Sequence, residues 1–195
     1  MSHKLLIVFS FLSLLAGLTT SAFASEKNDE LKVCPPDAIL KMDSQFGYGT
    51  SNLTTCLQKR KHVKDAVAWN SAKTNKMGAA QQAHITYNIT NNYENTYGMV
   101  LNKDYKLVVV AYAAGGRWLL SDEAYNRTFN VNTGNPTRAL VEKLIAKGIP
   151  VYMCQNTMHA NGWITSDLIP GTKMVPSGAT ALLDFQALGY HQITP

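Results

Sequence analysis

Cysteine is scarce in this chain of 195 residues: Cys34, Cys56 and Cys154 are its three cysteines, and no two of them are close in sequence. This spacing disfavours a metal site built from neighbouring thiols, even if His62 is counted as a further ligand. Cys154 also lacks the second cysteine, two residues away, that a thioredoxin-type oxidoreductase uses. We therefore expect neither a bound metal nor dithiol chemistry.

Nucleotide-binding motifs are missing as well. The sequence has no phosphate-loop motif with its lysine and no dinucleotide-binding glycine fingerprint. Nucleotide chemistry is therefore disfavoured, and we expect no cofactor.

Charged side chains are also few, because they make up only 16% of the residues and give a formal net charge of +5. The one dense basic patch, residues 59–64, has no interleaved aromatic side chains. Nucleic-acid binding needs a larger basic surface, so we expect no nucleic-acid partner. We interpret the patch as a solvated helix end that leads into the first strand.

The most apolar segment lies near the N-terminus and is too short to span a membrane. It runs over 14 residues, from Leu5 to Leu18, after the positive charge of Lys4, whereas a spanning helix needs about 20 residues. The small residues Ala22 and Ala24 then fit a cleavage site. The pattern predicts a signal peptide over residues 1–24, cleaved after Ala24. The mature protein would be periplasmic or secreted, with no membrane attachment.

Export places the cysteines in an oxidising environment, where three of them cannot all pair within one chain. Cys34 and Cys56 lie 22 positions apart in a segment whose prolines and glycines predict an irregular structure. A disulfide between them would stabilise the fold by about 3 kcal/mol in the loop-entropy model. We predict an N-terminal extension over residues 25–62, stapled by this bridge, and an α/β domain over residues 63–195. Cys154 is then the unpaired thiol.

Apolar runs and helical periodicities alternate along the predicted domain. Strands are predicted at residues 65–70, 105–113, 149–154 and 173–176, with a short edge strand within 190–195. Helices are predicted at residues 79–97, 136–147, after Cys154, at 163–168 and from Ser177 to Gly189, with a helical turn near 118–120. This alternation predicts right-handed crossovers. The fold class is therefore α/β, a three-layer sandwich with a mostly parallel central sheet flanked by helices.

The carboxyl ends of parallel strands share one edge of a sheet, and ligands bind in the crevice beyond it. The residues expected to gather there are Asn70, Gly115, Gly116, Cys154 and Ser177. The two glycines would let a ligand or a neighbouring subunit approach the backbone closely, or they simply form a turn. Ser177 and Gly178 would offer helix N–H groups to an anion, or Ser177 is an ordinary helix cap.

Cys154 is the candidate reactive group, because it follows a buried strand directly. Asn156 or Thr157 would cap the next helix, whose free N–H groups favour an anion and lower the pKa of the thiol. His159 would either reach the same sulfur or remain a solvated surface histidine. The competing interpretation is that Cys154 is an inert packing residue, since a free cysteine behaves as a small hydrophobic side chain.

Three segments then carry a resemblance to a known family: GIPVYMCQNT, DLIPG and VPSGATALLDFQALGY, followed by a terminal TP. Their order over residues 107–195 resembles the DsrE/DsrF-like proteins linked to intracellular sulfur oxidation and sulfur relay. The resemblance implies a three-layer α/β domain, assembly into trimers or hexamers, and a persulfide carried on the cysteine that matches Cys154. Unlike the cytoplasmic sulfur-relay members, this chain has a predicted export signal, and no second relay cysteine follows Cys154.

Two functions are consistent with these observations. The first is a periplasmic sulfur-transfer protein that carries a persulfide on Cys154, with a protein or a small thiol as sulfur donor or acceptor. The second is a noncatalytic oligomeric module of the same fold that binds a small ligand or a protein, in which the thiol only packs.

Overall fold

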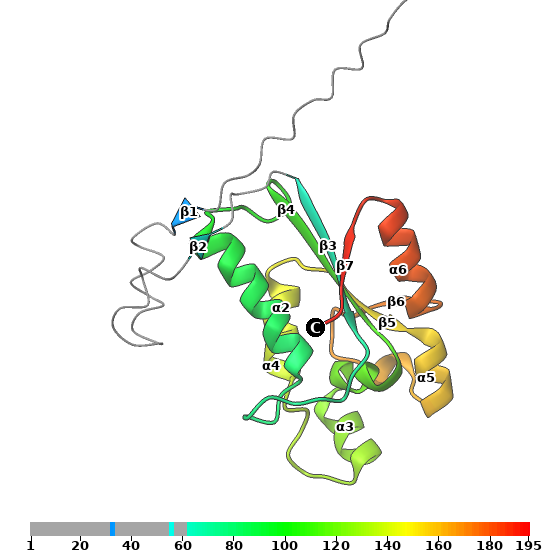
Figure 1. The fold of residues 1–195 in the computed structure, drawn as a ribbon. Helices are drawn as coiled ribbons and strands as arrows, with labels where there is room; N and C mark the ends of the chain where they lie inside the picture. The colour runs from blue at the N-terminus through cyan, green and yellow to red at the C-terminus, as the bar shows by residue number, and fades with distance from the viewer. Residues whose placement is uncertain (1–31, 34–54, 57–61) are drawn as a thin grey trace, which may run out of the picture.

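Five parallel strands form the central sheet of the protein in a computed structural model that describes residues 32–33, 55–56 and 62–195 (Figure 1). In chain order they are β3 (Val63–Trp69), β4 (Tyr105–Ala111), β5 (Val151–Cys154), β6 (Lys173–Val175) and β7 (His191–Ile193). Their order across the sheet is β6-β5-β4-β3-β7. The predicted strands are confirmed, including the short edge strand near the C-terminus.

The sheet is built around the pair β3 and β4, which match residue for residue from Val63 opposite Tyr105 to Trp69 opposite Ala111. Val109, Val110 and Ala111 of β4 are fully buried. A near-continuous apolar strand of this kind is covered on both faces, as parallel sheets require. The strand ends at Ala111, two residues earlier than predicted, and this leaves Tyr112 and Ala113 beyond the sheet edge.

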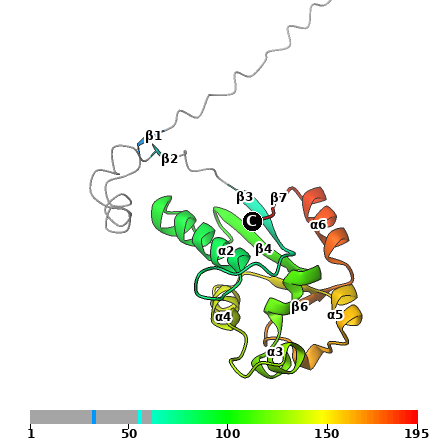
Figure 2. The same cartoon turned by 60° about the horizontal axis from the view of Figure 1, so that its bottom comes forward.

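Helices cover both faces of the sheet. On one face lie α2 (Gln81–Asn91), which continues as the π-helix η2 (Asn92–Thr96), and α4 (Arg138–Ala146), while α6 (Gly178–Ala187) covers the other face (Figures 1 and 2). The larger buried cluster includes Trp69, Val109 and Leu144. The smaller cluster joins Ala66, Val110 and Leu182 beneath α6. The predicted three-layer α/β sandwich is therefore confirmed.

Four shorter elements lie in the segments that connect the strands and the longer helices. They are the 3-10 helix η3 (Ala113–Leu119), α3 (Asp122–Phe129), α5 (Gln155–Asn161) and the 3-10 turn η4 (Thr165–Asp167). The helical turn near 118–120 and the helix after Cys154 are as predicted, although η3 is longer and begins earlier. α3 has no counterpart among the predicted helices.

Before residue 62, the structure describes only a two-stranded antiparallel ribbon of β1 (Lys32–Val33) and β2 (Thr55–Cys56). The predicted signal peptide, Cys34 and residues 59–61 of the basic patch lie outside the described residues. The Cys34–Cys56 disulfide therefore stays a prediction. None of the described helices combines the length and the hydropathy that crossing a membrane requires.

Candidate functional site

A hollow of about 280 Å³ opens at the carboxyl ends of β4, β5 and β6. Its walls come from the three segments that follow these neighbouring strands. The lining residues are Tyr112, Ala113, Cys154, Asn156, Thr157, Ala160, Asn161, Ser177, Gly178 and Ala179. Of the described residues that line it, none carries a formal charge, so any charge on a bound group must be met by amides and hydroxyls.

Cys154 is the last residue of β5 and the residue from which α5 begins. Its φ of −74° and ψ of 118° keep it in extended backbone, in the N-cap position. The prediction that Asn156 or Thr157 caps this helix is therefore wrong, because both lie inside the first turn. Cys154 is only 4% exposed, yet it lines the hollow.

The environment of the sulfur favours the thiolate. Burial raises the pKa of the Cys154 thiol, but hydrogen bonds from the Thr157 side chain and from the backbone N–H groups of Gly178, Thr157 and Asn156 lower it more, so the pKa lies below its ordinary value of 9.0. Hydrogen bonds made to the charged form favour ionisation. The amides belong to the first turns of two helices, α5 and α6, so two positive helix ends face one sulfur atom.

The start of α6 explains how the second helix reaches the sulfur. Val175 of β6 pairs with Cys154, and Ser177 caps α6 by accepting a hydrogen bond from the Thr180 N–H at 3.5 Å. A Cβ at the buried Gly178 would lie 2.7 Å from Cβ of Tyr112. Glycine is therefore required for α6 to begin this close to the end of β4. Ser177 is a helix cap that also lines the hollow.

Gly115 and Gly116 are buried in η3 and do not line the hollow. A Cβ at Gly115 would lie 2.1 Å from the carbonyl oxygen of Trp69, and one at Gly116 would lie 2.8 Å from Cγ2 of Thr157. The groups that approach these glycines closely are therefore the Trp69 backbone and the Thr157 side chain of the same chain, where a ligand or a neighbouring subunit was predicted. These glycines let η3 pack directly on the strand ends.

Two further candidates lie near the hollow without lining it. Asn70 Nδ2 donates to Tyr112 Oη at 3.4 Å, so Asn70 contacts one of the lining residues. His159 is exposed on α5 and is not part of the lining. Sequence reasoning missed Tyr112 and Ala113, because it assigned both to the strand. The Ala-Ala-Gly-Gly segment at residues 113–116 was the available signal that the strand had already ended.

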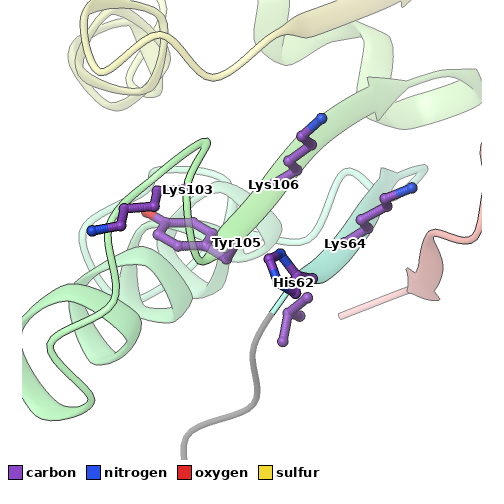
Figure 3. A pocket seen from close by; sticks show the side chains of 6 residues that line it. His62, Lys64, Lys103, Tyr105 and Lys106 are labelled. Carbon is purple, nitrogen blue, oxygen red and sulfur yellow. The ribbon is translucent and has the colours of Figure 1, made fainter.

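A second hollow, of about 140 Å³, lies at the amino ends of β3 and β4 (Figure 3). It is lined by His62, Val63, Lys64, Lys103, Tyr105 and Lys106. In Figure 3 the ammonium group of Lys103 points away from those of Lys64 and Lys106, which extend side by side in the opposite direction. Lys64 Nζ already donates to the Leu188 carbonyl at 2.9 Å. The cations therefore do not converge on a common anion.

Within residues 62–195 and the short ribbon, no three His, Cys, Asp or Glu side chains are grouped so that they could hold a metal ion. The chemistry available at the larger hollow is therefore that of a thiolate surrounded by neutral donors.

Comparison with known proteins places this site within a family. The model of the DsrE/DsrF-like family matches residues 69–195, which include every residue lining the Cys154 hollow.

Similar solved structures include the protein of unknown function MTH1491 from Methanobacterium thermoautotrophicum, which is 21% identical and has a TM-score of 0.47. The match covers 69% of this chain and 99% of that one. Another is the ychN protein from E. coli, with 18% identity, a TM-score of 0.44, and coverage of 68% and 99%. No curated protein matches this chain. Because the family model spans more than half of the sequence, the chain belongs to the DsrE/DsrF-like family.

Proposed function

We propose that this protein is a sulfur-transfer protein that carries sulfane sulfur as a persulfide on Cys154. Membership of the DsrE/DsrF-like family suggests a role in sulfur relay in general. The observation that carries the finer proposal is that Cys154 lines a hollow beside the first turns of α5 and α6, whose amides, together with the Thr157 side chain, lower the pKa of the thiol.

The proposed reaction is a thiolate exchange in two steps. The Cys154 thiolate attacks the outer sulfur of a persulfide donor R–S–SH, the S–S bond of the donor breaks, and R–S⁻ leaves, so that Cys154 becomes Cys–S–SH. An acceptor thiolate then attacks that outer sulfur and releases the Cys154 thiolate. Both steps conserve electrons, and both need an ionised sulfur on Cys154. The hydrogen-bond donors stabilise the thiolate as the attacking group and as the leaving group.

The hollow suits a small sulfur species. Its volume of about 280 Å³ accommodates an additional sulfur atom and part of a donor. The neutral donors Asn156, Asn161 and Ser177 in its wall offer N–H and O–H groups to an anionic sulfur without a competing carboxylate.

We also propose that the protein acts in the periplasm as a homo-oligomer, a trimer or a hexamer. Support for export is the signal-like pattern of residues 1–24. Support for assembly is the exposure of large apolar side chains on β6 and at the end of α6: Leu183 of α6 and Leu188, which follows it, are each 62% exposed, and Met174 of β6 is 39% exposed. Light scattering coupled to gel filtration measures the oligomer, and cell fractionation measures the location.

The test is sulfur loading followed by intact-mass measurement. Native protein incubated with glutathione persulfide is expected to gain the mass of one sulfur atom, and peptide mapping is expected to place that atom on Cys154. A Cys154→Ser variant is the control, because Cys34 and Cys56 remain in it. Equal loading of this variant, or no loading of the native protein, would overturn the proposal.

A second function is favoured by one observation, the exposure of only 4% for Cys154. A thiol so covered suits a noncatalytic binding module in which it only packs. That function predicts that native Cys154 resists iodoacetamide and that Cys154→Ala changes stability alone. Rapid alkylation of native Cys154 would exclude it.

A further inference from the structure

The side chain of Thr157 interacts with two groups that lie far apart in the sequence. Thr157 Oγ1 accepts a hydrogen bond from the Ala113 backbone N–H at 2.9 Å. The same side chain lies in the first turn of α5, three residues after Cys154, lines the hollow together with it, and acts to lower the pKa of the thiol. A hydroxyl carries a single proton and has acceptor lone pairs as well. Because Ala113 donates to the oxygen, the proton is free to point at the sulfur, and the incoming amide polarises it in that direction.

We propose that Thr157 is the positioning residue that activates Cys154, by passing the polarisation of the Ala113 amide to the sulfur through its hydroxyl. The inference rests on the proposed function only in taking Cys154 as the reacting group. It assigns to Thr157 a role different from helix capping, since the N-cap position is occupied by Cys154 itself.

The rotamer of Thr157 is held from both sides. Thr157 is 8% exposed. Its Cγ2 methyl fills the space beside Gly116, because a Cβ at Gly116 would lie only 2.8 Å from it. The methyl is thus packed against the glycine of η3, while the hydroxyl faces Ala113 and Cys154. A β-branched side chain fixed in this way cannot easily turn its hydroxyl elsewhere.

The backbone at Ala113 is specialised for the same contact. Ala113 has a φ of 48°, in the left-handed region that an alanine seldom occupies. It follows Tyr112, whose N–H donates to the Trp69 carbonyl at 2.9 Å, and it opens η3. Because the backbone changes here from a strand to a left-handed turn, the Ala113 N–H donates to Thr157 Oγ1 and does not pair within the sheet.

The other groups that lower the pKa of the thiol are backbone amides, which a side-chain substitution does not remove, and one of them is shared with a second acceptor. The Asn156 N–H also donates to the Pro176 carbonyl at 3.3 Å, so it is shared between two acceptors. The Gly178 and Thr157 N–H groups belong to the backbone. Thr157 Oγ1 is therefore the donor that a substitution removes without altering the main chain.

The test is the pH dependence of Cys154 alkylation by iodoacetamide in the full chain, with adducts assigned by peptide mapping. Thr157→Val keeps the shape and removes the hydroxyl, so the midpoint of the pH profile is expected to rise by about one unit, and the rate below the midpoint to fall about tenfold. Thr157→Ser restores a hydroxyl and is expected to keep the midpoint within a few tenths of a unit of the native one. Thr128→Val, at an exposed position of α3, is the matched control and leaves the profile unchanged.

A purely structural role would not move the titration. Thr157→Ala also removes the hydroxyl but changes the packing differently. The same upward shift of the midpoint in Thr157→Val and Thr157→Ala therefore identifies the hydroxyl as the cause. Thr157→Ala also serves as the test variant if Thr157→Val fails to fold. An unchanged midpoint in the hydroxyl-free variants overturns the inference, even if sulfur loading succeeds. Native protein with a low midpoint that takes up no sulfur overturns the proposed function and leaves the inference intact.

Discussion

The carboxyl group of Asp65 lies buried on β3, beneath the π-helix η2, and is 3% exposed as a residue. It accepts a hydrogen bond from the Tyr93 hydroxyl at 2.8 Å, and the pairing of β7 with β3 places His191 beside it. Burial raises the pKa of Asp65 above its ordinary value of 3.8, while Tyr93 and His191 act to lower it. A carboxyl that is more readily protonated in the folded state makes stability depend on pH.

The sign of that dependence follows from the raised pKa. The contribution of Asp65 to stability is fully present below the ordinary carboxyl pKa of 3.8 and is lost as pH rises through the higher folded-state value. Asp65→Asn removes this titration. The free energy of unfolding of the variant, relative to the native protein, is therefore expected to increase as pH rises from 4 towards neutrality. Urea unfolding at a series of pH values measures it. Asp184→Asn, on the exposed face of α6, is the control, and parallel pH profiles for Asp65→Asn and native protein would refute the prediction.

At the scale of single residues, the sequence was informative where a residue and its role lie in one segment. The position of Cys154 at the end of an apolar strand, and of Ser177 at the start of a helix, could be predicted from local pattern alone. The role of Thr157 could not, because its partner Ala113 lies 44 positions away and is aimed by a left-handed turn that alanine does not signal. The glycines of η3 were noticed, yet their neighbours are strand-end backbone and Thr157, which only the fold brings near.

Among the elements, α3 shows what hydrophobic periodicity fails to detect. Ser121 caps it by accepting from the Ala124 N–H at 3.2 Å, and Asp122 and Glu123 fill its first turn. Ala124 is the only fully buried residue within it. A helix of eight residues with so little apolar surface owes its stability to tertiary contacts, such as the stacking of Tyr125 on Trp118 with ring centroids 6.2 Å apart. The longer helices and the strands, by contrast, could be predicted within a few residues.

Asn135 joins the segment after α3 to η3. Its Nδ2 donates to the carbonyl oxygens of Trp118 at 3.0 Å and Leu120 at 2.7 Å, and its Oδ1 accepts from the Thr137 N–H at 2.9 Å. Asn135 is 5% exposed, so Asn135→Ala leaves these groups buried without partners. The substitution is expected to lower the free energy of unfolding by about 2–3 kcal/mol in urea titrations. Asn132→Ala, an exposed asparagine of the same loop, is the control and should cost less than about 0.5 kcal/mol. Equal losses in the two variants would contradict the prediction.

For the whole molecule, alternating strands and helices predicted the layers and the parallel sheet, but not the order of the strands. That order depends on pairing between segments far apart in the chain, such as β7 beside β3. The resulting sheet is uneven. β3 and β4 pair over seven residues in its middle, while β6 and β7 are edge strands of three residues each.

This unevenness predicts a gradient of local stability. Backbone amides of β3 and β4 are expected to exchange with deuterium most slowly, because they open only when most of the core unfolds. Amides of β6 and β7 should exchange faster, since each edge strand has a neighbour on one side only. Peptide-level hydrogen exchange with mass spectrometry measures both. Protection of β6 equal to that of β4 in the isolated protein would show that the edge is held by contacts beyond strand pairing.

The segment that delivers the Gly178 amide to the sulfur leaves directly from β6, on the weakly held margin of the sheet. If β6 detaches, the Gly178 amide is expected to leave the thiolate, so that the pKa of the Cys154 thiol rises. Local opening of the sheet edge is therefore expected to lower the reactivity of Cys154 before the core unfolds, and a contact that holds β6 in place is expected to preserve it.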